Sequence, residues 1–323
     1  MNNIPRNAGR LAAHFFSTKR LIHARLPVFL PFYHTVSDEK LSHILNYNYR
    51  NIQQFEEELD FYLENYKPIS LAELKSGNFS GKVFHLSFDD GLKECAEIIT
   101  PILHRKGIPA TFFINSAFVD NKELFHRYKA SLVLNELKRR TENQVLQFLH
   151  ENGITTDDIL QTSIHRTKIL DEAAGMLGVD FSRFLAREKP YLTTSQILDL
   201  QKQGFSIGAH SNRHPEFWLI DKEQQKEEIR LSFDWLEKNI YPEIKAFAFP
   251  YTDSGVTKSA FEYLHQEMGC DISFGTAGIK YDELENHFQR YPAEQPGNFV
   301  TNLKAEIIYH FLRKPVGKTI VRH

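Results

Sequence analysis

Short apolar runs recur along the chain, and each is followed by a stretch with helical features. The runs are rich in phenylalanine and apolar on both faces, as are strands that are buried on both sides of a sheet. They cover residues 27–33, 83–88, 110–114, 205–209, 246–251, 271–276 and 287–292. Strands that alternate with helices predict a parallel sheet, and seven such units favour a barrel over an open sheet. The pattern therefore predicts an α/β fold, a distorted (β/α)7-type barrel.

The segments between the runs carry helix signals. Four positions have N-cap spacing to a Gln or Glu three residues later: Asn51 with Gln54, Ser70 with Glu73, Thr193 with Gln196, and Asp221 with Gln224. Apolar residues recur at helical spacing within residues 222–239, and residues 92–106 read as a helix that ends before Gly107.

One long segment departs from this alternation. Between residues 115 and 194 we find no strand signal, only helix-like pieces at 123–140, 141–152 and 166–177. We therefore divide the chain into a basic segment at 1–26 and a barrel at 27–323, with a helical insertion at about 116–193. The insertion is either a lid or substrate wall at the barrel mouth, or a structural embellishment.

Composition narrows the function classes. The 323 residues are 41% hydrophobic and 25% charged, the balance of a globular protein, and the formal net charge of −2 disfavours a general nucleic-acid binder. The 26 Phe and 13 Tyr supply core material, and also rings that could stack on sugars. Two cysteines without zinc-type spacing suit a reducing compartment, although one disulfide stays open.

The N-terminal segment is basic. Arg6, Arg10, Lys19, Arg20 and Arg25 precede the first acidic residue, with several apolar residues between them. This predicts either a helix that lies on an anionic membrane or a helix that packs on the barrel with a solvated basic face. We see no export signal and no run long enough to span a bilayer, so we expect a cytoplasmic protein, with peripheral membrane contact as an alternative.

Three polar clusters follow the apolar runs. Asp89 and Asp90 end the run at 83–88, His210 and His214 follow the run at 205–209, and Tyr251 closes the run at 246–251. Each is weak alone, since Asp-Asp-Gly is common in turns and a lone histidine pair is often surface or core. Together they offer one carboxylate and two imidazoles, an open three-ligand metal site, provided that the chain turns helically between the histidines. The second carboxylate is then free to act as a base.

These residues also resemble a known family. Ser-Phe-Asp-Asp-Gly at 87–91, His-Ser-Asn-Arg-His-Pro at 210–215, Phe-Pro-Tyr at 249–251 and Phe-Tyr-His-Thr-Val at 32–36 are similar to the motifs of the polysaccharide deacetylases, carbohydrate esterase family four, the nodulation-type deacetylase homology domain. The resemblance covers roughly residues 27–292, insertion aside. It implies that Asp89 is the general base and that Asp90, His210 and His214 bind one divalent ion, commonly zinc, sometimes cobalt or nickel.

The resemblance further implies a reaction and a substrate class. The typical reaction is hydrolysis of an N-acetyl group on an N-acetylhexosamine, with the backbone N–H near Tyr251 as an oxyanion donor. Pro250, Tyr251 and Trp218 are then candidates for substrate contact. We expect removal of N-acetyl or O-acetyl groups from a surface polysaccharide or its precursor. Two alternatives stay open: an amidohydrolase on a small non-peptide amide, and an inert carbohydrate-binding protein that keeps its metal.

Two family features have no clear match. The arginine that often precedes the Pro-Tyr pair is replaced by Ala248, so Arg290 either orients Asp89 instead or forms a surface salt bridge. The late-motif histidine that serves as general acid is also missing. His310, in a string that reads more like a helix, and His34, at the end of the first apolar run, are the candidates.

Overall fold

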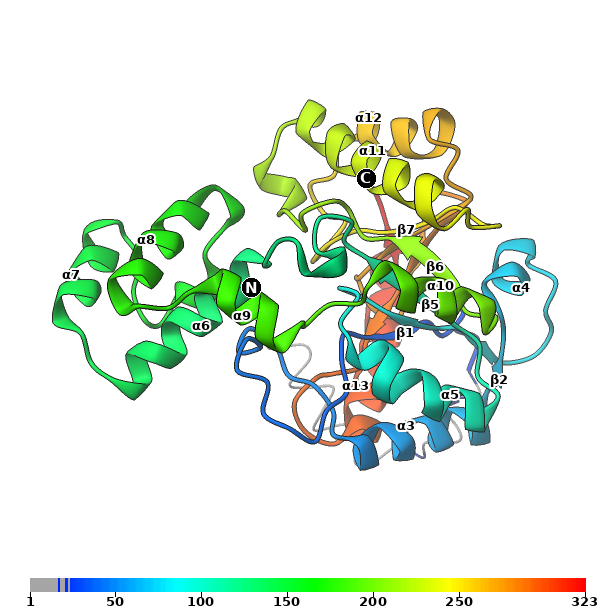
Figure 1. Ribbon diagram of the computed structural model, residues 1–323. Coiled ribbons are helices and arrows are strands. Elements are labelled where there is room, and N and C mark those ends of the chain that lie inside the picture. The colour runs from blue at the N-terminus through cyan, green and yellow to red at the C-terminus, as the bar shows by residue number, and fades with distance from the viewer. Residues whose placement is uncertain (1–16, 18–20, 23) are drawn as a thin grey trace.

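The structure is a computed structural model that describes residues 17, 21, 22 and 24–323 (Figure 1). Most of the basic N-terminal segment, including Arg6, Arg10, Lys19 and Arg20, lies outside the described residues. The helix predicted there, whether bound to a membrane or packed on the barrel, therefore lies outside them as well. Among the described helices, none is both long and apolar enough to cross a bilayer.

Eight parallel strands form the central sheet, in the order β10-β8-β7-β6-β5-β4-β1-β11. They are β1 (Pro31–Tyr33), β4 (Leu86–Phe88), β5 (Ala110–Ile114), β6 (Ser206–Ala209), β7 (Ala246–Ala248), β8 (Ile272–Gly275), β10 (His287–Gln289) and β11 (Tyr291–Pro292). Helices surround this nearly closed barrel, which confirms the predicted fold class (Figure 1).

The last apolar run closes the barrel by pairing with both ends of the sheet. Its first half, β10, pairs with β8, and its second half, β11, pairs with β1. Arg290 lies between the two halves, and its backbone N–H donates to the Gly275 carbonyl at 3.1 Å. The sequence predicted one strand here, and the structure divides it because one segment has to bridge two differently placed neighbours.

The covering helices begin where the sequence placed them. All four predicted capping boxes are present, at the starts of α3 (Ile52–Asn65), α4 (Leu71–Ser76), α10 (Thr194–Lys202) and α11 (Lys222–Asn239). The segment before Gly107 is a π-helical turn (Cys95–Ile99) followed by α5 (Thr100–Lys106). Further elements of the barrel part are α12 (Lys258–Glu262), α13 (Phe299–Arg313) and the short parallel pairs β2 (Lys67–Pro68) with β3 (Val83–Phe84) and β9 (Tyr281–Asp282) with β12 (Ile320–Val321).

Between β5 and β6 the chain forms a helical lobe beside the barrel (Figure 1). It contains α6 (His126–Arg139), α7 (Asn143–Glu151), α8 (Thr167–Leu177) and α9 (Phe181–Glu188). The lobe has an apolar cluster of its own, including Val133, Leu149 and Leu170. Because that cluster is separate from the barrel core, we expect substitutions in most of the lobe to leave the packing of the sheet unchanged.

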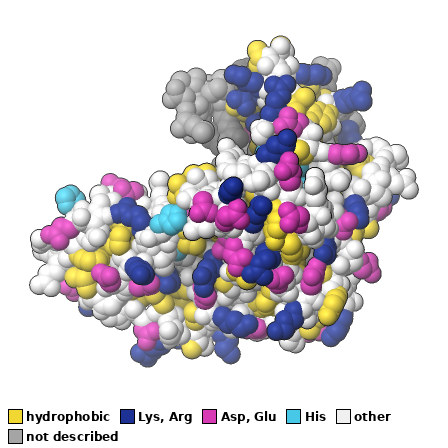
Figure 2. Space-filling model, turned by 90° about the horizontal axis from the view of Figure 1, so that it is seen from above, with side chains coloured by type: hydrophobic (Ala, Val, Ile, Leu, Met, Phe, Trp, Pro, Cys, Tyr) yellow, Lys and Arg dark blue, Asp and Glu magenta, His cyan; other side chains and the backbone are white. Residues whose placement is uncertain are grey.

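The two cysteines, Cys95 and Cys270, are both free and buried, so the alternative of a disulfide between them is wrong. On the outer surface, basic and acidic side chains are interspersed over the face drawn in Figure 2. This mixture agrees with the small net charge of −2.

Candidate metal centre and active site

The two adjacent carboxylates lie at the carboxyl end of β4. The backbone N–H of Asp89 donates to the Tyr33 carbonyl at 2.9 Å, which continues the pairing of β4 with β1 by one residue. The chain then leaves the sheet through Asp90, whose φ is +71°. A left-handed conformation is costly for a residue other than glycine, and such residues gather at functional sites. Both side chains are buried, which brings two negative charges into the barrel mouth.

The two histidines follow β6 in a turn that is not helical. Ser211 has φ +65° and His214 has φ +56°, so the helical turn expected from their spacing is wrong. The turn is held from outside by Glu228 of α11, which accepts from the backbone N–H groups of Asn212 (2.9 Å) and Arg213 (2.7 Å). The result still brings the rings together, with centroids of His210 and His214 4.9 Å apart.

Asp90, His210 and His214 converge on one point. Asp90 Oδ1 lies 3.3 Å from His214 Nε2 and 3.7 Å from His210 Nε2, and all three ligand atoms lie within 4.8 Å of one another. These separations exceed good hydrogen bonds and suit atoms that share an ion. Asp90 Oδ1 is also a buried oxygen without a hydrogen-bond partner among the described residues, which a bound cation would satisfy. The three residues therefore fit a divalent metal ion.

The protonation states also suit a metal. His210 Nδ1 donates to the Ala248 carbonyl at 2.7 Å, which leaves the lone pair on Nε2, on the side of Asp90. Burial lowers the pKa of His210, and burial together with the nearby His210 lowers the pKa of His214, so both imidazoles are neutral at pH 7. Burial raises the pKa of Asp90.

Asp89 is held separately, by Arg290. The guanidinium makes two bonds to the carboxylate, Nη1 to Oδ1 at 2.7 Å and Nη2 to Oδ2 at 2.8 Å. Arg290 is 1% exposed, so it is not a surface residue, and it lies 4.4 Å from the ring centroid of Phe32. Burial alone would raise the pKa of Asp89, but Arg290 outweighs it and lowers the pKa overall. Asp89 is thus ionised and fixed in place beside the three candidate ligands.

A cavity of about 210 Å³ opens onto these groups. His34 lines it directly after β1, and its Nδ1 lies 2.6 Å from Glu294 Oε2. Burial would lower the pKa of His34, but Glu294 more than compensates and raises it to about 9. The ring is stacked on Tyr47 at 4.4 Å between centroids. A protonated imidazole therefore faces the same cavity as the ionised Asp89.

The model of the polysaccharide deacetylase family matches residues 76–270, more than half of the chain. The chain belongs to the polysaccharide deacetylase family. The matched range contains Asp89, Asp90, His210, His214 and Tyr251, and this membership confirms the resemblance drawn from the motifs. No curated protein matches this chain at a significant level.

Several solved structures share the fold of this family member at low identity. The Streptococcus pyogenes deacetylase PplD in complex with acetate is 16% identical with a TM-score of 0.56, over 86% of this chain and 97% of that one. IcaB from Ammonifex degensii is 16% identical with a TM-score of 0.57, over 87% and 98% of the two chains. A de-N-acetylase from Aggregatibacter actinomycetemcomitans is 13% identical with a TM-score of 0.55, over 85% and 97%.

The two histidines that are candidates for the general acid lie in very different places. His34 lines the cavity, whereas His310 lies in α13 with its Nδ1 on the Ile279 carbonyl at 2.7 Å and is not among the residues that line the cavity. Tyr251 lines the cavity, with φ +56° and its ring 4.5 Å from that of His214. Trp218 packs edge-on against Tyr251 at 5.7 Å and stays 43% exposed, at the outer side of Tyr251.

Sequence reasoning missed several residues of this candidate site. Glu294, the partner of His34, follows β11 by two residues and carries no motif of its own. The helical insertion supplies Phe125 and Arg127 to the cavity wall, and Tyr128, whose hydroxyl donates to Asp90 Oδ2 at 3.3 Å. The start of the insertion therefore forms part of the cavity wall, which its sequence pattern alone did not decide.

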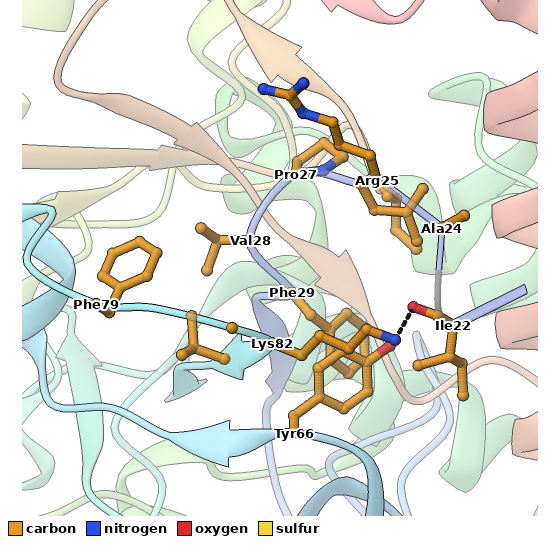
Figure 3. Close-up of a pocket in the computed structure, with 13 residues that line it drawn as sticks. Ile22, Ala24, Arg25, Pro27, Val28, Phe29, Tyr66, Phe79 and Lys82 are labelled. Atoms are coloured by element: carbon orange, nitrogen blue, oxygen red, sulfur yellow. Dashed lines mark hydrogen bonds between the residues drawn. The ribbon is translucent and has the colours of Figure 1, made fainter. Parts of the chain in front are cut away.

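A second cavity, of about 250 Å³, lies at the opposite end of the barrel strands (Figure 3). It is bordered by Phe29, which precedes β1, and Val83, which begins β3, and its described lining is mostly apolar, with Arg25 and Lys82 as the charged members. Lys82 Nζ donates to the Ile22 carbonyl at 2.5 Å. Without a carboxylate or imidazole among its described lining residues, this cavity is not suited to metal or acid–base chemistry.

Proposed function

We propose that this chain is a metal-dependent hydrolase that removes an N-acetyl group from a sugar of a surface polysaccharide or its precursor. Membership of the polysaccharide deacetylase family supports a hydrolase that acts on acetyl groups of carbohydrates. The observation that carries the finer proposal is the separation of Asp89 from Asp90. One carboxylate is paired with Arg290 and ionised, while the other faces two neutral imidazoles in the same cavity.

Asp90, His210 and His214 would hold a divalent ion, zinc by preference and cobalt or nickel as alternatives. Three protein ligands are typical of a catalytic metal, since a further position is left for water or substrate. When bound, such an ion polarises the acyl carbonyl and lowers the pKa of water toward about 7. Tyr128 supports this set, because its hydroxyl donates to the oxygen of Asp90 that does not face the imidazoles.

Asp89 acts as the general base. Its carboxylate lies beside the ligand set, with Oδ2 at 3.8 Å from His210 Nε2, and Arg290 keeps it ionised. The fixed orientation from two parallel hydrogen bonds positions one carboxylate for a proton transfer from the attacking water. This pair argues against an inert binding protein, which gains nothing from a second buried carboxylate.

His34 is the general acid in this proposal, in preference to His310. Its Nδ1 is taken by Glu294, which leaves Nε2 to protonate the leaving amine. Because its pKa is raised to about 9, the imidazole carries its proton at neutral pH. An amide needs such an acid more than an ester does, so His34 favours N-acetyl over O-acetyl substrates.

Tyr251 and its neighbours receive the substrate. The Pro250 carbonyl accepts from the Thr252 backbone N–H at 2.6 Å, which fixes the peptide that carries the Tyr251 N–H, the proposed donor to the oxyanion. Thr276 Oγ1 donates to the Tyr251 carbonyl, also at 2.6 Å, and fixes the other side of this left-handed residue. Tyr251 lines the cavity on this side, whereas Pro250, which precedes it, is not among the lining residues. Trp218 packs on Tyr251 from outside as a partly exposed surface on which a sugar ring could stack.

Acetate release from N-acetylglucosamine oligomers, measured together with bound metal, tests the proposal. Asp89→Asn should keep its metal and lose activity, whereas His210→Ala should lose both. Asp171→Asn, at an exposed carboxylate paired with Lys129, is the matched control and should resemble the wild type. Unchanged acetate release in Asp89→Asn removes that residue from its role. Full metal content in His210→Ala refutes the ligand set.

A further inference from the structure

A second group of ligand-type side chains lies outside the cavity, on the outer side of β8 and β10. Asp253 comes from the loop after β7, Asp282 ends β9, His287 begins β10 and His323 follows β12. One ligand atom from each lies within 4.8 Å of all the others. The four side chains are 2%, 0%, 0% and 6% exposed, so two carboxylates and two imidazoles meet away from solvent.

Three of the six distances between these ligand atoms lie around the edge length of a coordination tetrahedron. Asp253 Oδ2 lies 3.0 Å from His287 Nε2 and 3.8 Å from His323 Nε2, and Asp282 Oδ2 lies 3.1 Å from His323 Nε2. A tetrahedral ion with ligands at about 2.1 Å has edges of about 3.4 Å. The observed separations fall on both sides of that value.

The hydrogen bonds behind His287 fix its ring so that Nε2 points into this group. The Cys270 carbonyl only accepts, so His265 Nδ1 donates to it at 3.0 Å. Burial lowers the pKa of His265, so the ring is neutral and its Nε2 accepts from Ser273 Oγ at 3.0 Å. The Ser273 hydroxyl then accepts from His287 Nδ1 at 2.7 Å. His287 Nε2 in turn faces a carboxylate oxygen of Asp253 at 3.0 Å, where either a cation or a proton can lie between the two atoms.

The two carboxylates are bridged by an amide that cannot neutralise them. Gln289 Oε1 accepts from the Ala277 backbone N–H at 2.7 Å, so its Nε2 donates to both Asp253 and Asp282. The amide carries no charge, and the carboxylates keep theirs. Gly275 gives Asp253 its place, because a Cβ there would lie 2.3 Å from Asp253 Oδ2. A residue with a side chain at position 275 would therefore displace Asp253 from this acidic pair.

We propose that Asp253, Asp282, His287 and His323 bind a second divalent ion of the zinc class with a structural role. Two carboxylates balance the charge of such an ion. Ser273 forms a hydrogen bond with Nδ1 of His287 and so fixes the orientation of this ligand's ring, which is the usual role of a residue that lies behind a metal ligand. Four protein ligands form a closed site, unlike the three at Asp90, His210 and His214. The ion joins three parts of the chain: the loop after Tyr251, the β8–β10 edge of the barrel, and the segment after β12.

The test is metal stoichiometry in a protein that lacks the first site. The tag-free double variant Asp90→Asn, His214→Ala is dialysed against zinc and then buffer, and its zinc is counted. We expect two equivalents in the wild type and one in this background. Adding His323→Ala should bring the count close to zero, whereas adding Arg322→Ala, at the exposed neighbouring residue, should leave it at one.

A second measurement covers variants that fold poorly. Zinc should raise the Tm of the background protein and leave the Tm unchanged after Asp282→Asn, which preserves the shape of the side chain. A background protein that binds no zinc shows that protons alone hold the group together and overturns the proposal. One equivalent retained in both His323→Ala and Asp282→Asn places the ion elsewhere and overturns it as well.

Discussion

Replacement of Arg290 by methionine removes the partner of a buried carboxylate. The guanidinium makes two bonds to Asp89, at 2.7 and 2.8 Å, and a third to Ser87 Oγ at 3.1 Å. The two side chains of the pair are 1% and 2% exposed, so solvent cannot replace the lost interactions. Breaking a buried pair from one side typically costs about 3–5 kcal/mol. We expect Arg290→Met to lower the free energy of unfolding by about that amount, and Tm by about 4–7 °C.

The same change should alter catalysis in a defined direction. Without Arg290, burial is no longer outweighed, and the pKa of Asp89 rises. A base must be deprotonated to act, so the acidic limb of the pH–rate profile should move to higher pH while the metal content stays at the wild-type value. Acetate release as a function of pH, beside urea denaturation followed by circular dichroism, measures both effects.

Two further variants serve as controls for the Arg290→Met experiment. Arg105→Met breaks the exposed pair with Glu56, whose atoms lie 2.7 Å apart, and should cost only about 0–1 kcal/mol. Adding Asp89→Asn to Arg290→Met should recover part of the lost stability, since a neutral amide no longer leaves a charge buried. If Arg290→Met costs no more than Arg105→Met, the buried pair does not hold Asp89 in the way described.

Three other substitutions probe the candidate site and its surroundings. Tyr128→Phe removes a hydroxyl from Asp90 and should weaken metal binding about 10-fold in a competition titration; unchanged affinity dismisses Tyr128 as a support. Wild-type kcat should fall as pH rises through about 9, where His34 loses its proton, and His34→Gln should lack that decline and be slower by roughly 100- to 10,000-fold. The same alkaline decline in His34→Gln assigns the acid elsewhere. If the exposed ring of Trp218 stacks on a sugar and this contact contributes about 1.4 kcal/mol to binding, Trp218→Ala should raise KM about 10-fold with little change in kcat. An unchanged KM excludes that contact.

Much of the fold could be predicted because its signals are local. The side chains of Asn51, Ser70, Thr193 and Asp221 cap helices through bonds that span three residues, so spacing alone reveals them. The strands of the central sheet are mostly buried, and an apolar run therefore marks each of them, whereas the partly exposed strands β2, β9 and β12 carry no such run. Asp90 and the two histidines were also predictable as neighbours, since the ends of parallel strands meet at one rim of a barrel.

The rest depends on contacts that no local pattern carries. The turn between His210 and His214 takes left-handed residues at Ser211 and His214, which favour glycine, so its shape could not be read from these residue types. Arg290 reaches Asp89 across 201 positions because the last strand closes the barrel at that point. Glu294 meets His34 across 260 positions for the same reason.

Anomalous diffraction from zinc-loaded crystals, recorded on both sides of the zinc absorption edge, tests the central claim most directly. We expect a peak at about 2.0–2.2 Å from a carboxylate oxygen of Asp90 and from Nε2 of both His210 and His214, with Asp89 still paired to Arg290 and outside the coordination sphere. A map without zinc at these three side chains, or one with Asp89 among the ligands, contradicts the division of the two carboxylates into ligand and base.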